Sequence, residues 1–296
     1  MATLRDIRRR ISSVRSTQQI TKAMKMVSAA KLRRAQERLI SARPYADRMH
    51  TLLAHVAAEV DRSQHPLLVE RLSAQAGEAK SILYVVVSAD RGLCGSFNAN
   101  ILRKAKGEID AHKQNGEVGV GLMVIGRKSF EYFSRRGYPI AEKHVNIFDN
   151  LEFHHATLIS DLIQRMYREK AVDRVLAVYN EFKSAALQKV VTRQLLPIQL
   201  QYPEMQVYQP VEYLYEPSVG HILNDICPKF LNVQIWRMLL ESYASEQGAR
   251  MVAMESASEN AQEMIYDLTL YYNKVRQAGI TKEIAEIVGG ANALRG

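Results

Sequence analysis

The sequence contains only two cysteines, Cys94 and Cys227, and they are far apart. No CxxC pair and no Cys/His spacing typical of a metal site occurs, so the pattern favours neither a disulfide scaffold nor a zinc site. The chain also lacks any run of 18 or more apolar residues, and its Arg-rich N-terminus has no apolar signal region. We therefore expect neither a transmembrane span nor a secretory signal, and we expect a cytosolic compartment.

Proline is absent before Pro44 and after Pro228. Because an interior proline removes a backbone donor and clashes with the preceding turn, the two ends of the chain are free to form long helices. We expect one helix from Thr3 to about Ala58 and another from about Lys229 to Val288, each too long for a compact domain at about 1.5 Å per residue. Pro228 suggests a restart or kink, and Gly248 weakens the second helix by roughly 1 kcal/mol relative to alanine.

Both terminal helices need a partner for their apolar stripes. In the C-terminal stretch the stripe has the alternating three- and four-residue spacing of a coiled coil. Its members are Met251, Met254, Ser258, Ala261, Ile265, Leu268, Tyr272 and Val275. The N-terminal stripe begins with Ile7, Ile11 and Val14 and continues through Gln18, Thr21, Lys25 and Ser28. We predict a long antiparallel coiled coil with a seam rich in small and polar residues.

The formal net charge of +9 is concentrated at the N-terminus. Residues 1–50 contain thirteen basic and three acidic residues, a net charge of +10, so the other 246 residues carry about −1. Nucleic-acid binding would gain from interleaved aromatic side chains, but none precedes Tyr45. Membrane binding needs a large apolar face, and residues 23–30 offer only a weak one. We favour contact with an acidic protein surface over a merely solvated charged face.

The middle of the chain, residues 78–210, alternates short apolar runs with helical patterns. This alternation predicts an α/β fold class, with a Rossmann-like domain and a largely parallel sheet inserted between an N-terminal helix (1–60) and a C-terminal helix (217–296). The expected strands are Ser81–Ser88, Val120–Gly126, Val172–Phe182 and Lys189–Ile198. The expected helices are Asn98–His112, Arg127–Arg136 and Leu151–Glu169.

Several motifs resemble chemical sites but have simpler explanations. The glycine-bearing turn in Ser88–Asn100 could bind phosphate, yet it lacks the GK[ST] ending of a P-loop, and a tight strand-to-helix turn needs glycine anyway. Cys94 has no evident His base, so we expect a buried structural cysteine. Gly121–Ser129 resembles a nucleotide-binding loop, but the residues between its two glycines are typical of a buried strand. We therefore expect no nucleotide site there. His154 and His155 are adjacent and make poor joint ligands, so we expect solvated or capping roles.

Two other functions stay open from the residues alone. One is a nucleic-acid-binding α/β protein with a basic helical arm, which would show a steep salt-dependent affinity for DNA or RNA. The other is a small nucleotide- or phosphate-handling enzyme centred on Asp90–Ser96, which Cys94→Ala should inactivate.

Six segments of the sequence are similar to the γ-subunit family of F-type ATP synthases, and the resemblance covers essentially the full length. They are Ile7–Gln36, Ser88–Asn98, Tyr179–Ala185, Tyr213–Pro217, Ser245–Ala261 and Tyr272–Leu294. The resemblance implies a non-catalytic central rotor shaft that couples proton flow to ATP synthesis or hydrolysis by rotation. It implies no cofactor, metal or catalytic residue, and a bacterial protein held peripherally on the cytoplasmic side of the cell membrane.

The resemblance also implies partners. The paired terminal helices would enter the ring of α and β subunits, and the α/β domain would contact the ε subunit and the c-ring. Contacts with a β subunit would involve Met24, Lys25 and Arg250, and, near the C-terminus, Arg276, Gln277, Thr281, Glu283 and Glu286. Contacts with the ε subunit and the c-ring would involve Tyr213 and Tyr215.

Overall fold

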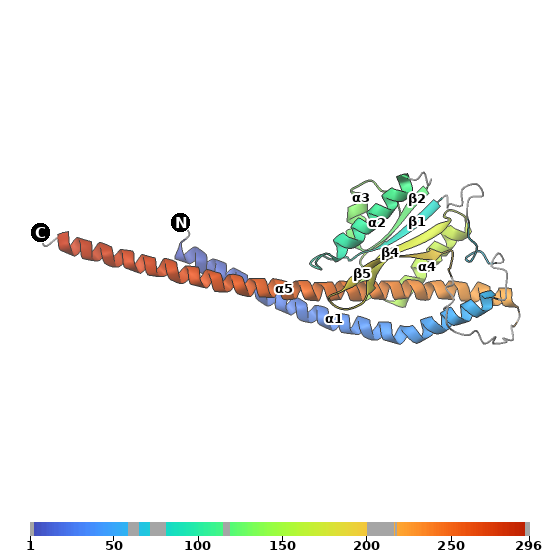
Figure 1. The fold of residues 1–296 in the computed structure, drawn as a ribbon, viewed down its shortest axis with the longest axis horizontal. Helices are drawn as coiled ribbons and strands as arrows, with labels where there is room; N and C mark the ends of the chain where they lie inside the picture. Colours follow the sequence, from blue (N-terminus) through green and yellow to red (C-terminus); the bar gives the residue numbers. More distant parts are fainter. Residues whose placement is uncertain are drawn as a thin grey trace. The chain divides into compact units, whose positions relative to one another are not determined.

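The computed structural model describes residues 3–58, 65–71, 81–114, 119–199, 216 and 218–293. The chain divides into two compact units, which are described separately: an α/β unit, Ala29–Ala249, and a helical unit, made of Met1–Ser28 and Arg250–Gly296. Two long helices, α1 (Leu4–Ala58) and α5 (Val219–Ala293), contribute residues to both units (Figure 1). The prediction of a long helix at each end of the chain is confirmed.

Neither long helix is interrupted at its proline. Pro44 lies inside α1 and Pro228 lies inside α5. A restart at Pro228 is therefore wrong, because α5 begins well before it, and a kink there stays a prediction. The residues four positions earlier, Ile40 and Asn224, are both exposed. Water can therefore hydrogen-bond the carbonyls that the prolines leave without a donor, so the helices continue through both positions.

The α/β unit is built on a five-stranded sheet in the order β3-β2-β1-β4-β5. The strands are β1 (Ser81–Val87), β2 (Gly119–Ile125), β3 (Ile140–His144), β4 (Arg174–Phe182) and β5 (Gln188–Leu196). Strands β3, β2, β1 and β4 are parallel to one another, and β5 is antiparallel to β4. The prediction of a largely parallel sheet is therefore confirmed. Strand β3 was not expected, because its mostly polar sequence at the sheet edge has no apolar run.

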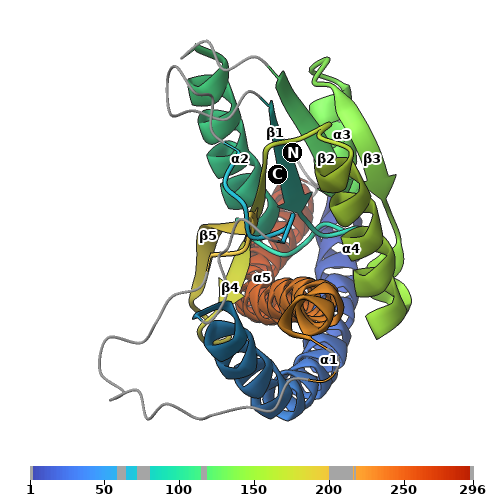
Figure 2. The same ribbon diagram turned by 90° about the vertical axis from the view of Figure 1, so that its right-hand side faces the viewer.

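Helices cover both faces of this sheet. Helices α2 (Phe97–Gln114) and α3 (Arg127–Ser134) pack on one face, and α4 (Phe153–Arg168) packs on the other together with the parts of α1 and α5 that belong to this unit. Figure 2 shows α2 and α4 on opposite faces. A short 3-10 turn, η2 (Ile147–Asn150), connects β3 to α4.

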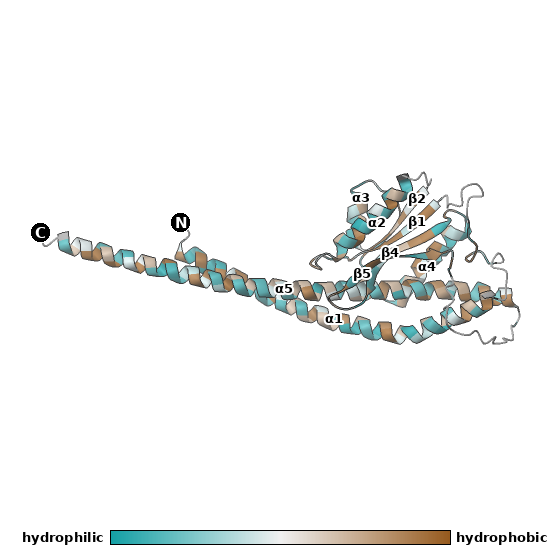
Figure 3. Ribbon diagram, viewed as in Figure 1, coloured by the Kyte–Doolittle hydropathy of each residue, from teal (hydrophilic) through white to brown (hydrophobic). Residues whose placement is uncertain are grey.

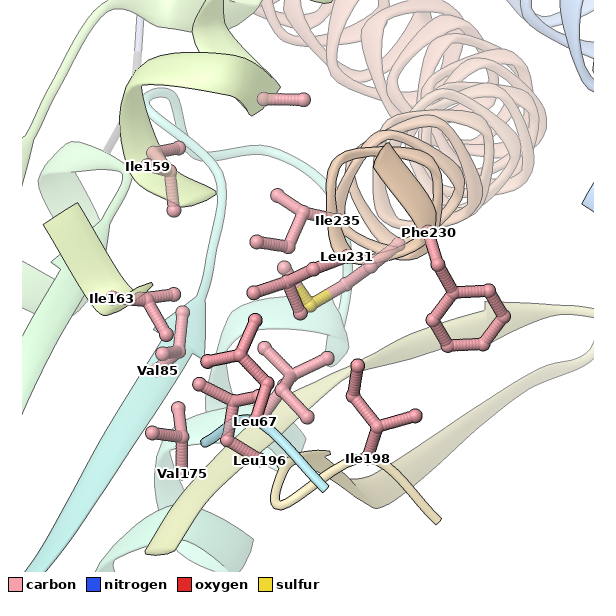
Figure 4. Close-up of a cluster of buried hydrophobic side chains, with 14 of the residues drawn as sticks. Leu67, Val85, Ile159, Ile163, Val175, Leu196, Ile198, Phe230, Leu231 and Ile235 are labelled. Carbon is pink, nitrogen blue, oxygen red and sulfur yellow. The ribbon is translucent and has the colours of Figure 1, made fainter. Parts of the chain in front are cut away.

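Strand β1 supplies side chains to both faces. Ile82, Tyr84 and Val86 join the cluster under α2 and α3, whereas Leu83, Val85 and Val87 join the cluster under α4 and α5. Figure 4 shows the second cluster, in which side chains from α4, α5 and the sheet converge. It includes Leu67, Val85, Ile159, Ile163, Val175, Leu196, Ile198, Phe230, Leu231 and Ile235. Each fully buried aliphatic side chain contributes about 1.5–3 kcal/mol, so this face anchors α5 in the α/β unit.

Hydropathy differs between the sheet and the long helices. In Figure 3 the central strands are mostly apolar, whereas polar and apolar residues alternate along α1 and α5. All but the first residue of β1 are buried. This pattern is typical of a sheet covered on both faces and of helices that bury only one stripe.

The glycine at position 248 of α5 is explained by close packing against a neighbouring turn. A Cβ atom at this position would lie 3.1 Å from both the Cα and the carbonyl oxygen of Ala185. Ala185 lies in the turn between β4 and β5, where the N–H of Ser184 donates to the carbonyl of Leu187. The glycine therefore lets the turn approach the helix closely.

Candidate interaction surface of the helical unit

The helical unit is an antiparallel pair of helix segments from α1 and α5. Along α1 from Arg8 through Gln18 to Lys25, the partner on α5 moves back from Tyr272 through Gln262 to Glu255. Ile7 of α1 and three apolar α5 residues of the expected stripe are buried at the seam, namely Met254, Ala261 and Ile265. The predicted antiparallel pairing of the terminal helices is confirmed.

The middle of this seam is polar. The Thr21 and Ser258 hydroxyl oxygens are 2.6 Å apart, and the Gln18 amide donates to Gln262 Oε1 at 2.8 Å and to the Ser258 carbonyl at 3.3 Å. We call these four residues the polar layer. Gln18, Thr21 and Ser258 are all buried. Each buried group has a partner, so the layer avoids the full cost of an unsatisfied polar group.

Lys25 forms an ion pair within the helical unit. Its ammonium group lies 2.5 Å from the carboxylate of Glu255, and the two side chains are 39% and 45% exposed. The ion pair borders a groove of about 260 Å³. The lining residues are Gln18, Lys22, Lys25, Glu255, Ser258, Glu259 and Gln262. Met24 beside it is half-buried, whereas Arg250 is only 9% exposed.

The other five expected contact residues lie near the C-terminal end of α5 and are all exposed. They are Arg276, Gln277, Thr281, Glu283 and Glu286. Residues seven apart share a helix face, so Arg276 lies above Glu283, while Gln277 and Thr281 lie on a neighbouring face. Glu286 forms an ion pair with Lys282 at 3.6 Å. The five side chains are therefore distributed around the helix and do not converge on one pocket.

An apolar stripe near the same end of α5 was missed by sequence reasoning. Ile280, Ile284, Ile287 and Val288 follow the i, i+4, i+7, i+8 spacing of one helix face and are 48–71% exposed. Because α1 begins at Leu4 and Arg8 already contacts Tyr272, the stripe lies beyond the paired part of the helical unit. The spacing is visible in the sequence, but its exposure follows only from where α1 begins.

The phosphate-like turn after β1 uses its polar groups to hold the sheet together. Asp90 Oδ1 accepts from the backbone N–H of Arg127 at 2.9 Å and of Asn146 at 2.8 Å. Asn98 Oδ1 accepts from the Ala89 N–H at 3.0 Å. Cys94 is buried, with its sulfur 3.2 Å from the Asn98 amide nitrogen. The expected burial of Cys94 is confirmed, and the polar side chains of this turn have partners within the α/β unit.

The remaining motifs have structural roles where they are described. The apolar residues of the Gly121–Ser129 motif form the buried end of β2. His155 Nδ1 accepts from the Glu152 N–H at the start of α4, a capping role, and His154 is exposed.

The second cysteine, Cys227, is also buried, and burial raises the pKa of its thiol to about 12. Tyr213 and Tyr215 lie outside the described residues.

In the described part of the chain, none of the helices combines the length and the apolar character needed to cross a membrane. Among these same residues, no group of three His, Cys, Asp or Glu side chains is arranged to hold a metal ion.

Comparison with known proteins places this geometry in a family. A family model described as ATP synthase matches residues 3–294. The ATP synthase gamma chain of Chlorobaculum tepidum is 49% identical over 299 residues, covering 100% of both chains. That of Heliobacterium modesticaldum is also 49% identical, over 99% of this chain and 100% of the relative. The chain belongs to the ATP synthase γ-chain family.

Solved structures agree with this γ-chain assignment. A chain in the central stalk and c-ring structure of the Tetrahymena thermophila mitochondrial ATP synthase has a TM-score of 0.58 and 29% identity, covering 81% of this chain and 99% of that chain. A chain in the Euglena gracilis OSCP/F1/c-ring structure has a TM-score of 0.68 at 19% identity, covering 98% and 94%. The second likeness concerns the fold alone.

Proposed function

We propose that this chain is the central rotor subunit of an F-type ATP synthase, and that it couples proton flow through a membrane sector to ATP synthesis or hydrolysis by turning inside a ring of α and β subunits. Membership of the γ-chain family supports the proposal. The Tetrahymena structure that resembles this chain is described as a central stalk with its c-ring.

The observation that carries the proposal is the exposed apolar stripe at the end of α5. Four large aliphatic side chains lie on one helix face, beyond the paired part of the helical unit. Burying such a face in a partner is favourable by about 25 cal/mol per Å² of apolar surface. An apolar inner surface of the ring would bury this face through contacts that have no preferred direction, so it would not fix the rotation of the helix.

Other residues of the two long helices would provide the specific contacts. We assign contacts with a β subunit to Met24, Lys25 and Arg250, and to the exposed set Arg276, Gln277, Thr281, Glu283 and Glu286. Arg276 can donate several hydrogen bonds to carboxylate or carbonyl oxygens. Because Lys25 is paired with Glu255, a β-subunit carboxylate would have to compete for it. Weak, competing contacts suit a subunit that must leave each position in turn.

Coupling would arise from asymmetry. Two packed helices have a cross-section without threefold symmetry, so they present a different face to each of three β subunits. Rotation changes nucleotide affinity only if the contact free energies differ among the states of the ring. No active-site residue is needed in this chain for that mechanism.

The remaining partners are the ε subunit and the c-ring, which we assign to the region of Tyr213 and Tyr215. This assignment makes the chain a peripheral protein on the cytoplasmic side of a bacterial cell membrane. The high identity to gamma chains of Chlorobaculum tepidum and Heliobacterium modesticaldum supports a bacterial source.

The test is assembly with α and β subunits. Ile280→Asp with Ile287→Asp places two charges on the stripe, and we expect it to weaken binding to the ring at least tenfold, because burying each isoleucine is worth about 1.5–3 kcal/mol. ATP-driven rotation of the assembled complex, observed on single molecules, should be lost or become intermittent. Circular dichroism checks that the helices remain folded.

Ala278→Asp with Ala285→Asp is the matched control, because both alanines are seven residues apart on the opposite helix face. This pair adds the same charge and should bind and rotate almost as the unchanged chain does. Equal effects of the two pairs would contradict burial of the stripe in a partner. ATP hydrolysis by the isolated chain at the rate of the assembled complex would contradict a rotor role altogether.

A further inference from the structure

Three residues of the polar layer, Gln18, Thr21 and Ser258, are buried inside the helix pair. We infer that Gln18, Thr21, Ser258 and Gln262, together with the Lys25–Glu255 ion pair, fix the axial register of α1 against α5 in the helical unit. The inference concerns the chain itself and does not depend on the proposed rotor function.

An apolar layer at these positions is expected to be as stable as the polar layer or more stable. Thr21 and Ser258 are 8% and 7% exposed, so both hydroxyls have been removed from water. Replacing a buried polar pair by packed apolar side chains of similar size is often neutral or stabilising. The polar groups therefore call for an explanation other than stability, and register is the best-attested one in paired helices.

The hydrogen bonds distinguish this register from its neighbours. If α5 slipped by one heptad, Thr21 would face Ile265 or Met251 in place of Ser258, and its hydroxyl would be buried against an apolar side chain. A slip by one turn in either direction would place Thr21 opposite Ala261 or Met254, which are also apolar. Each mismatch leaves a buried polar group without a partner, at a cost of about 1–3 kcal/mol.

The apolar residues of the seam cannot make this distinction alone. They recur at three- and four-residue spacings, so a slipped pair still brings apolar side chains together. The ion pair discriminates against a slip by one heptad but not against every slip by one turn, because Glu259 lies one turn from Glu255 on α5. Its half-exposed geometry makes it the weaker element, worth about 1 kcal/mol or less.

The experiment measures register directly. Spin labels on Ser12→Cys and Val252→Cys, both exposed positions that lie about 24 Å apart along the helix axis, report the axial offset of the two helices in the full chain by double electron–electron resonance. The native cysteines are buried, so labelling is directed to the new sites. A slip by one heptad moves the labels by about 10 Å along the axis, at 1.5 Å per residue. We expect the unchanged layer to give one narrow distance.

Two variants make the layer apolar. One changes all four residues (Gln18→Leu, Thr21→Val, Ser258→Ala, Gln262→Leu), and a milder one changes only Thr21→Val and Ser258→Ala. We expect both to add distances shifted by about 5–10 Å, as one- or two-turn slips require, with an unchanged or higher melting temperature. The exchange Thr21→Ser with Ser258→Thr keeps the hydroxyl pair and should keep the single distance.

A single unchanged distance in the apolar variants would overturn the inference. If the fourfold variant does not fold, the nearly isosteric twofold variant decides alone. Loss of the single distance in the hydroxyl exchange as well would also overturn it, because the effect would then follow from any change at these positions.

Discussion

Gly248 lies in the interior of α5, where helix propensity alone favours alanine by about 1 kcal/mol. Its surroundings reverse that expectation, because a Cβ would lie 3.1 Å from backbone atoms of Ala185 that cannot rotate away. Overpacking of this kind costs about 1–3 kcal/mol. We therefore expect Gly248→Ala to lower the free energy of unfolding by about 1 kcal/mol, measured by urea denaturation.

Gly279→Ala is the matched control in the same helix. A Cβ there would meet nothing within 4 Å, so only helix propensity acts. This variant should stabilise α5 locally by up to about 1 kcal/mol, which hydrogen exchange of its amides can measure. A stabilising effect at both glycines would show that the approach of Ala185 is unimportant.

His65 is a second residue whose effect depends on its surroundings. It is 3% exposed, and its Nδ1 accepts from the Leu67 N–H at 3.3 Å. Burial, with a smaller contribution from the charge of Arg168, lowers the pKa of His65 below its ordinary value. The unfolded state therefore binds more protons, and the stability that neutral His65 confers is lost as pH falls from about 6.5 towards the folded-state pKa.

His65→Asn tests this pH dependence. Asparagine can still accept from the N–H two residues on, but it does not titrate in this range. We expect the fall in the urea midpoint between pH 7 and pH 5 to become smaller than in the unchanged chain. Some fall should remain, because burial also lowers the pKa of His144. His154→Asn, at an exposed position, is the control, and an equal reduction there would contradict the role of burial.

At the scale of elements, the predictable features were those set by local pattern. Apolar runs marked β1, β2, β4 and β5, and good helix formers without glycine marked α1. The polar edge strand β3 has no such run, since it pairs only with β2 and buries little. The continuity of α5 through Pro228 was also missed, because it depends on solvent reaching the carbonyl of Asn224 and on core packing of Phe230 and Leu231.

Pro228→Ala tests the account of α5. The variant restores a backbone donor for the Asn224 carbonyl and removes the clash with the preceding turn. It also gives the unfolded chain more freedom, which offsets part of the gain by about 0.4–1 kcal/mol. We expect a net stabilisation of about 1–2 kcal/mol, measured by urea denaturation.

Pro44→Ala in α1 should act in the same direction, because Ile40 is exposed in the same way as Asn224. If either variant were destabilising, the proline would have a packing role that compensates for its missing donor. Hydrogen exchange of the flanking amides would then show slower exchange in the unchanged chain than in the variant.

At the scale of the whole molecule, the sequence located the helix pair but not its internal contacts. Lys25 and Glu255 are 230 positions apart, and only the register of α1 against α5 brings them together. The sequence predicted polar residues in the seam of α1, but it did not show that Ser258 and Gln262 of α5 are the partners of Gln18 and Thr21. Contacts between distant segments follow from the fold, and local patterns do not encode them.

The concentration of positive charge in residues 1–50 leads to a prediction about association. Arg5, Arg9 and Arg15 are exposed on α1 in the helical unit. Changing all three to glutamine should slow association with the α and β ring by about tenfold at low ionic strength, since charge complementarity steers encounter. Association kinetics measured at several salt concentrations should converge for variant and unchanged chain at high salt, where these exposed charges are screened.

A control with the same loss of charge separates location from net charge. Arg135, Lys170 and Lys189 are exposed on the α/β unit, and changing them to glutamine removes three positive charges as well. If the N-terminal helix is what meets an acidic partner, this second triple variant should associate at nearly the unchanged rate. If both triple variants slow association equally, only the overall charge matters, and the concentration of basic residues in the first fifty positions has no special part in recognition.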